Sequence, residues 1–134
     1  MTLVDTNVIV DLLTADATWF EWSAEHLDQC RRAGQIYVNE ITYAELSARI
    51  DVEANVQMAL RELSLQLERM PVAALFAAGR AFSRYRAAGG PRTTVLPNFF
   101  IGAHASVARL PILTRDVRRY RAYFPKVRLI APEA

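Results

Sequence analysis

Residues 2–13 read TLVDTNVIVDLL and introduce a pattern that recurs along the chain. A short apolar run, TLV, is followed at once by Asp5 and then by residues with the apolar spacing of a helix. This strand–acid–helix unit is typical of a parallel sheet covered by helices. It also predicts where a site would lie, because ligands of open parallel sheets bind beyond the carboxyl ends of the strands.

The rest of the chain repeats this alternation, without a linker, repeat or low-complexity tract, so we expect one α/β domain. We predict the segment RTTVLP, residues 92–97, to be a loop. The predicted strands are 2–4, 35–38, 67–70, 112–114 and 127–130. The predicted helices are 7–13, 18–32, 41–50, 51–65 with Asp51 as its cap, 72–88, 99–109 and 117–123.

Composition narrows the class of protein. The chain has 134 residues, 52% of them apolar, which suits one folded core. No apolar run approaches the roughly 20 residues that span a bilayer, so we expect no membrane segment. The N-terminus lacks a basic lead, which argues against a signal peptide. Cys30 is the single cysteine, so we expect an unreactive thiol and a cytoplasmic protein.

Acids follow two of the predicted strands: Asp5 in LVDTN and Asp116 in PILTRD. We expect both to project toward the same rim of the sheet, where their charges repel unless a cation or a shared proton intervenes. Glu45 is a third candidate, because it lies inside a helix with apolar neighbours and acids are seldom buried unpaired. Glu40 competes with it, although Glu40 suits the first turn of a helix without any metal.

A hard divalent ion such as Mg²⁺ would join these carboxylates, because it prefers oxygen ligands. Such an ion can position water and stabilise charge on a phosphodiester. The alternative is that Asp5 and Asp116 only cap helices, where acids are favoured. Asn98, at the predicted start of a helix, carries an amide where this chemistry calls for an acid.

Four stretches in this order, VDTNVIVDLL, ITYAEL, LPNFFIGAHA and LTRDVRRY, resemble the four motif regions of PIN-domain ribonucleases. More narrowly, they resemble the VapC toxins of bacterial type II toxin–antitoxin systems. Each motif alone is weakly specific, but the four agree in order and spacing over nearly the whole chain. The resemblance implies a single PIN domain, residues 1–134, folded as a three-layer α/β/α sandwich around a short, mainly parallel sheet.

The resemblance also implies a Mg²⁺- or Mn²⁺-dependent endoribonuclease, a hydrolase with four catalytic positions at Asp5, Glu45, Asn98 and Asp116. Asp5, position 98 and Asp116 would bind the metal, and Glu45 would help to hold it or orient the attacking water. The groups that fix these carboxylates would be Thr6, Asn7 and Thr114.

Partners follow from the same resemblance. It implies a homodimer that is inhibited by a VapB-type antitoxin, with operator DNA bound only through that antitoxin. The substrate would be structured RNA, often tRNA and sometimes rRNA. Five arginines are candidates for phosphate contacts, and the alternative is a solvated surface on which they pair with acids. They are Arg80, Arg84, Arg86, Arg92 and Arg115.

One position departs from the family pattern, which has aspartate where this chain has Asn98. An amide keeps the shape and one carbonyl oxygen but loses a negative charge, so it should bind a divalent ion more weakly. We interpret Asn98 as an inactivating substitution, introduced deliberately because an active toxin is hard to express alone. A natural asparagine that only caps the helix is the alternative. The chain as written is predicted to be inactive or greatly weakened.

Other functions fit the sequence less well. A natural pseudo-nuclease that only binds the antitoxin or RNA remains the alternative. A receiver domain would need a mid-chain phosphoacceptor aspartate, which the sequence lacks. A dehalogenase-like phosphatase would need DxD after its first strand, where this chain has DTN. We also predict that His104 is a packed histidine. Four aromatics are candidates for a groove that binds an antitoxin helix, and the alternative is that each only packs in the core: Trp19, Phe20, Trp22 and Tyr43.

Overall fold

A five-stranded parallel sheet runs through the chain in the order β3-β2-β1-β4-β5, as seen in a computed structural model that describes residues 1–91 and 96–132. The strands are β1 (Thr2–Val4), β2 (Ile36–Val38), β3 (Leu65–Leu67), β4 (Ile112–Leu113) and β5 (Leu129–Ile130). All four neighbouring pairs are parallel. The predicted α/β architecture with a parallel sheet is therefore confirmed.

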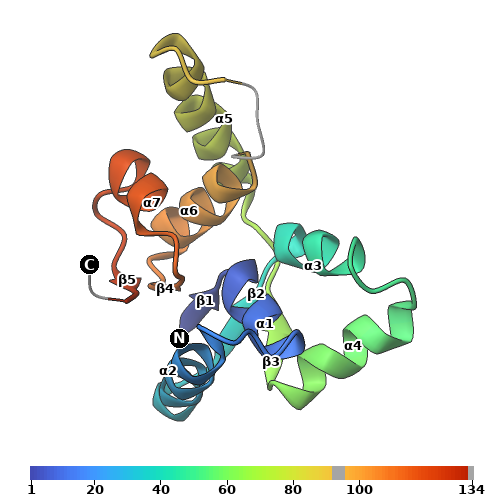
Figure 1. The fold of residues 1–134 in the computed structure, drawn as a ribbon. Coiled ribbons are helices and arrows are strands. Elements are labelled where there is room, and N and C mark those ends of the chain that lie inside the picture. The colour runs from blue at the N-terminus through green and yellow to red at the C-terminus, as the bar shows by residue number, and fades with distance from the viewer. Residues whose placement is uncertain (92–95, 133–134) are drawn as a thin grey trace.

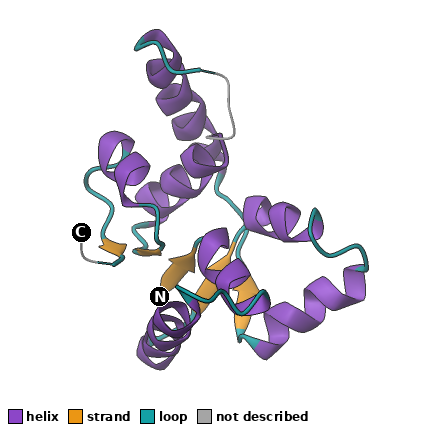
Figure 2. Ribbon diagram, in the orientation of Figure 1, coloured by secondary structure: helices purple, strands orange, loops and turns teal. Residues whose placement is uncertain are grey.

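Seven helices connect the strands within the described residues, as Figures 1 and 2 show. They are α1 (Thr6–Leu13), α2 (Phe20–Ala33), α3 (Glu40–Ser47), α4 (Glu53–Glu62), α5 (Val72–Ala87), α6 (Leu96–Ala108) and α7 (Val117–Tyr123). None of these helices has the length and apolar character that crossing a membrane requires.

Alternation along the strands builds a core on both faces of the sheet. Successive side chains of a strand point to opposite faces, so Leu3 and Val4 enter different clusters. Val4 and Leu113 pack with residues of α1, α2 and α4, whereas Leu3 and Ile112 pack with α6 and α7. The sheet is thus covered by helices on both sides, as a three-layer α/β/α sandwich requires.

The strand order reverses direction at β1. This strand pairs with β2 on one side and with β4 on the other, although β4 comes more than 100 residues later in the chain. Such a switch point opens a crevice beyond the carboxyl ends of the two strands, which is where open α/β sheets bind ligands. Asp5 directly follows β1 at this position, and Asp116 opens the helix after β4.

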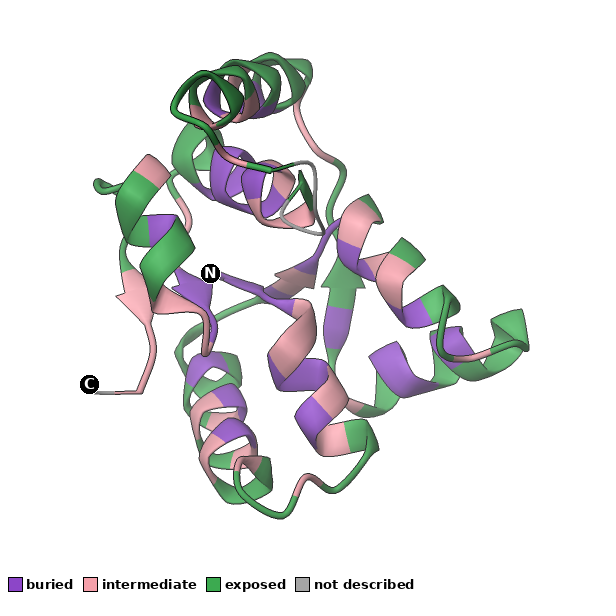
Figure 3. Cartoon of the chain, turned by 45° about the horizontal axis from the view of Figure 1, so that its top comes forward, coloured by how far each residue is buried: buried purple, intermediate pink, exposed green. Residues whose placement is uncertain are grey.

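Helices α5 and α6 form an alanine-rich pair that carries a core of its own. Ala74, Ala78 and Ala81 of α5 face Phe99 and Ala103 of α6. Figure 3 shows that the outer side of α5 is exposed along its length. The tight packing continues to α7, because a side chain at Gly102 would collide with the ring of Phe124.

Several predicted boundaries were wrong. The helix predicted over 41–50 ends at Ser47, and the one predicted over 51–65 runs only over Glu53–Glu62, capped by Val52 instead of Asp51. Ser64, with φ 60°, then turns the chain into β3, two residues earlier than predicted. Helix α6 begins at Leu96, so Asn98 lies within its first turn instead of before it. Residues 92–95 of the predicted loop lie outside the described residues.

Candidate active site

Asp5 is the centre of the polar cluster beyond β1. It is only 4% exposed, yet both of its carboxylate oxygens accept hydrogen bonds. Oδ1 accepts from the backbone amide of Thr6 at 2.8 Å. Oδ2 accepts from the hydroxyls of Thr114 at 2.7 Å and Tyr120 at 2.9 Å, and from the Asn7 amide at 3.3 Å. The carboxylate is therefore fixed in one orientation by groups from three parts of the chain.

Burial raises the pKa of Asp5 above its usual range. The hydrogen bonds from Thr114, Tyr120 and Thr6 lower that pKa, and the nearby charge of Glu45 raises it further. The pKa of Tyr120 is raised well above 10, first by burial and then by the charge of Asp5. Tyr120 therefore stays protonated, and its hydroxyl donates a hydrogen bond to the Asp5 carboxylate.

Glu45 reaches the same cluster through Thr6. The Thr6 hydroxyl donates to Glu45 Oε1 at 2.7 Å, and its backbone amide donates to Asp5. Glu40 lies elsewhere, since its Oε1 accepts from the Met70 amide at 2.9 Å. Of the two competing acids, the structure brings Glu45 and not Glu40 into the cluster.

Asn98 connects the remaining acid to Tyr120. Its Nδ2 donates to Asp116 Oδ2 at 3.2 Å and to the Tyr120 hydroxyl at 3.4 Å. The Asp116 amide in turn donates to Thr114 at 2.9 Å. Asp116 holds the cap position of α7 but its side chain makes no capping hydrogen bond. Capping therefore does not explain Asp116, whereas Asp5 does accept a bond from the first residue of α1.

The oxygen ligands in the cluster are of the type that a hard cation prefers, but their total negative charge is too small. Asp5 and Asp116 offer carboxylate oxygens, which Mg²⁺ prefers, and position 98 offers an amide instead of a third carboxylate. Within residues 1–91 and 96–132, no three His, Cys, Asp or Glu side chains gather closely enough to hold a metal ion. Asn98 also turns its NH₂ group, not its oxygen, toward Asp116. The residues fit a divalent cation with one charge too few.

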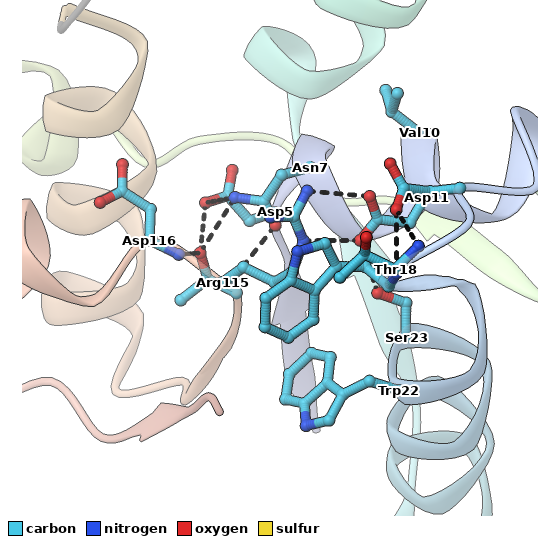
Figure 4. A network of polar contacts seen from close by, with 12 residues as sticks. Asp5, Asn7, Val10, Asp11, Thr18, Trp22, Ser23, Arg115 and Asp116 are labelled. Carbon is cyan, nitrogen blue, oxygen red and sulfur yellow. Dashed lines mark hydrogen bonds and ion pairs between the residues drawn. The ribbon is translucent and has the colours of Figure 1, made fainter. Parts of the chain in front are cut away.

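Sequence reasoning missed a buried ion pair beside the cluster. Asp11 of α1 is 2% exposed and binds Arg115 in a bidentate pair, with Nε at 2.7 Å and Nη2 at 2.8 Å. Ser23 of α2 donates to the same carboxylate, and the Arg115 guanidinium lies 4.9 Å from the ring centre of Trp19. Figure 4 shows Arg115 extending from the segment that carries Asp116 across to Asp11.

Tyr120 was also missed. In the sequence it reads as one aromatic among the arginines of VRRYRAY. Its contact with Asp5 joins residues 115 positions apart, which no local pattern reveals. Asp11 carried a weak signal, because an acid at the buried face of an apolar helix needs a partner.

The five arginines proposed for RNA do not form one group. Arg115 is occupied by Asp11, and Arg86 donates to the Gly90 carbonyl at 2.8 Å. Arg80 and Arg84 line a cleft formed by α5, α6 and α7. Arg92 lies outside the described residues. A phosphate contact by Arg115 stays a prediction that its ion pair does not favour.

The predicted aromatic groove is wrong. Trp19 and Phe20 are successive residues near the start of α2, about 100° apart around a helix axis, and they line two different clefts. Trp22 stacks on His26. Both Trp22 and Tyr43 pack against the core. The packed role of His104 is confirmed, because it is buried and its Nδ1 lies 3.2 Å from Asn39 Nδ2. Cys30 is likewise buried, and burial raises the pKa of its thiol.

The sequence of residues 2–125 matches the family model of the PIN domain. This chain belongs to the PIN domain family. PIN domains are generally nucleases, so the cluster beyond β1 and β4 lies in a nuclease fold. No curated protein matches the chain significantly in sequence.

Solved structures share the fold of this PIN domain at low sequence identity. The VapBC2 structure from Rickettsia felis, bound to a promoter DNA fragment, has a TM-score of 0.73 at 16% identity, covering 97% of each chain. The VapBC-1 structure from nontypeable Haemophilus influenzae has a TM-score of 0.69 at 17% identity, covering 97% of this chain and 96% of that chain. A toxin–antitoxin complex from Klebsiella pneumoniae has a TM-score of 0.64 at 22% identity, covering 95% of each. These similarities establish the three-layer fold.

Proposed function

We propose that this PIN domain is the toxin of a type II toxin–antitoxin system, built as a Mg²⁺- or Mn²⁺-dependent endoribonuclease. The observation that carries the proposal is the cluster at the switch point, where Tyr120 links Asp5 to Asn98 and Asn98 reaches Asp116. One of the solved structures with the same fold is named a toxin–antitoxin complex and two are named VapBC, which supports the toxin assignment.

The partners and setting belong to the same proposal. A VapB-type antitoxin would inhibit the protein and connect it to operator DNA. The substrate would be structured RNA such as tRNA or rRNA in the cytoplasm. We further propose that two copies form a homodimer. Light scattering of the purified chain tests the last point directly.

The residues divide the work of phosphodiester hydrolysis. A bound Mg²⁺ would supply charge stabilisation and a more acidic water. Asp5 and Asp116 would hold the ion, with Thr114 bonded to both segments so that the two carboxyl groups keep their spacing. Glu45, held by Thr6 and only half buried, would orient the attacking water. Asn7 completes the support by donating to Asp5 and accepting from the Arg115 amide at 3.2 Å.

Asn98 would disable this machinery in the chain as written. Its NH₂ group donates a hydrogen bond to Asp116, where an aspartate would place a second negative charge. The repulsion between two carboxylates, which a cation would relieve, is therefore absent. We propose that aspartate at this position restores the repulsion with Asp116, so that the site binds a metal ion.

The test compares this chain with its Asn98→Asp variant on a pool of tRNA and rRNA. Each is incubated with Mg²⁺, with Mn²⁺ and with EDTA. We expect discrete fragments only from Asn98→Asp with metal, and none when Asp5→Asn is added to that variant. Folded proteins that all leave RNA intact would contradict the nuclease proposal.

A second candidate, a pseudo-nuclease that only binds, has one observation in its favour. The Asn98–Asp116 hydrogen bond satisfies the site without any metal. Cleavage by Asn98→Asp would favour the enzyme. Tight binding of an antitoxin or RNA by a variant that never cleaves would favour the binding module.

A further inference from the structure

The two parts of the chain carry opposite charge. Residues 1–68, the acidic half, hold 12 Asp or Glu and four Arg, a net charge of −8. Residues 69–132, the basic half, hold 11 Arg, one Lys and a single acid, Asp116, a net charge of +11. In Figure 1 the acidic half is the blue-to-green part and the basic half the yellow-to-red part. The small net charge of +2 hides this separation.

The boundary between the halves passes through the switch point of the sheet. Strands β1, β2 and β3 belong to the acidic half, and β4 and β5 to the basic half. The cluster takes Asp5 and Glu45 from the acidic half and Asn98 and Asp116 from the basic half. A polyanion that reaches this cluster is attracted to one side of it and repelled by the other.

Two adjoining clefts concentrate the positive charge of the basic half. One has a volume of about 410 Å³ and is lined by Arg80, Arg84 and Lys126 together with Phe76. The other, of about 470 Å³, is lined by Arg109, Lys126 and Arg128. Ser106 and Lys126 line both, so the two clefts lie next to each other.

These cations are available to a ligand. All five side chains are exposed. Among the described residues, no acid lines either cleft, and none of these five cations takes part in an ion pair. Five cations held together without a counter-charge repel one another, and an external anion relieves that repulsion.

The first cleft also presents aromatic rings beside the cations. Phe76 is 72% exposed on α5, and Tyr123 and Phe124 are half buried opposite it. An exposed ring beside arginines suits an unpaired nucleotide, because the phosphate contacts the cations and the base stacks on the ring. Duplex DNA shields its bases from such stacking, so the combination favours unpaired RNA.

We propose that the two clefts, from Arg80 and Arg84 past Lys126 to Arg109 and Arg128, bind an unpaired segment of RNA, with one base stacked on Phe76. The surface is separate from the residues assigned to cleavage, since none of them lines these clefts in the part of the chain that the structure describes. It rests on the proposed function only in the choice of RNA, and Asn98 allows binding to be measured without cleavage.

The experiment measures fluorescence anisotropy of a labelled 20-nucleotide oligouridylate in EDTA at several salt concentrations. The variant Arg109→Glu/Arg128→Glu is compared with Arg49→Glu/Arg61→Glu. The latter makes the same change of net charge on exposed residues of the acidic half. We expect the first pair to weaken binding at least about 10-fold and to reduce the slope of log Kd against log salt by about 1.4, at roughly 0.7 per lost contact. The control pair should change Kd less than about 2-fold.

Stacking is tested by Phe76→Ala. We expect a loss of roughly 10-fold in affinity for the oligouridylate without a change in the salt slope, since stacking releases no counterions. Because this side chain is exposed, the variant should fold normally, and circular dichroism and molar mass by light scattering check that it does.

Several outcomes would overturn the proposal. Equal loss in the two double variants would mean that only net charge matters. Duplex DNA bound as tightly as oligouridylate would assign the surface to DNA. A lower molar mass for Phe76→Ala would make the cleft a contact between copies of this chain. None of these results bears on cleavage by Asn98→Asp, so the proposed function is tested separately.

Discussion

The acidic half and the basic half differ in charge by more than the whole molecule's net charge suggests, yet ion pairs do little to join them. Among the ion pairs of the described residues, only Asp11–Arg115 crosses between the halves. Parallel pairing of β1 with β4 and apolar packing on both faces of the sheet make the main contact. Because packing holds the halves together, the five cations that line the two clefts remain available to a ligand.

Breaking the Asp11–Arg115 pair should have the largest effect on stability. We expect Asp11→Ala to lower the free energy of unfolding by about 3 kcal/mol, because it leaves a partly buried guanidinium unpaired. Urea denaturation measures the loss. Asp28→Ala is the matched control, since Asp28 pairs with Arg31 and Arg32 on an exposed surface and should give no measurable change. Equal effects of the two variants would show that the Asp11–Arg115 pair contributes no more to the free energy of unfolding than an exposed ion pair does.

An acid added to the basic half at position 98 should make the site dependent on a metal ion. In EDTA, Asn98→Asp should destabilise the protein by roughly 1–3 kcal/mol, because a second carboxylate would face Asp116 where an amide now donates. Mg²⁺ should restore stability in this variant and have little effect on the parent chain. Thermal unfolding with and without the metal measures both. Identical metal responses would contradict a metal site at this position.

Two glycines test how tightly the basic half is packed. Gly102→Ala should cost about 1–3 kcal/mol, because the new methyl group meets the Phe124 ring. Gly79→Ala, on α5 with no atom within 4 Å of the new methyl group, should instead stabilise by about 0.5–1 kcal/mol. Urea denaturation of both variants gives the answer. A Gly102→Ala variant that is as stable as the parent chain or more so would mean that α6 does not need the close approach to Phe124.

Acid should loosen a neutral contact between the halves. Burial lowers the pKa of His104, and Asn39 Oδ1 already accepts from the α3 amides at Ile41 and Thr42, which leaves its NH₂ to donate to neutral His104. The unfolded chain therefore binds more protons as the pH falls below about 6.5, and stability is lost there, by up to about 1.4 kcal/mol per pH unit. Denaturation at pH 7.5 and 5.5 should show this loss, and His104→Gln should reduce it. An unchanged slope in the variant would assign the pH dependence to other groups.

The local parts of the site could be predicted from the sequence. An apolar strand followed by Asp5 and a helix needs only near neighbours, and the order of a parallel sheet then places Asp5 and Asp116 at one rim. The position of Glu45 inside a helix, beside apolar neighbours, was the reason to prefer it to Glu40, which suits the first turn of that helix. Helix ends were less predictable, as α3 and α4 show, because tertiary packing decides which turns persist.

Short-range pattern and the order of the motifs were enough to predict the fold class and, through the resemblance to PIN domains, the family and four candidate site positions. The surroundings of these four residues depend on long-range packing. Tyr120 contacts Asp5, which lies 115 positions away in the sequence, and Arg115 contacts Asp11, which lies 104 positions away. Neither contact can be predicted from a local sequence pattern. The direction of the Asn98 amide was decided in the same way, because the acceptors on Asp116 and Tyr120 meet it only after α6 and α7 pack together.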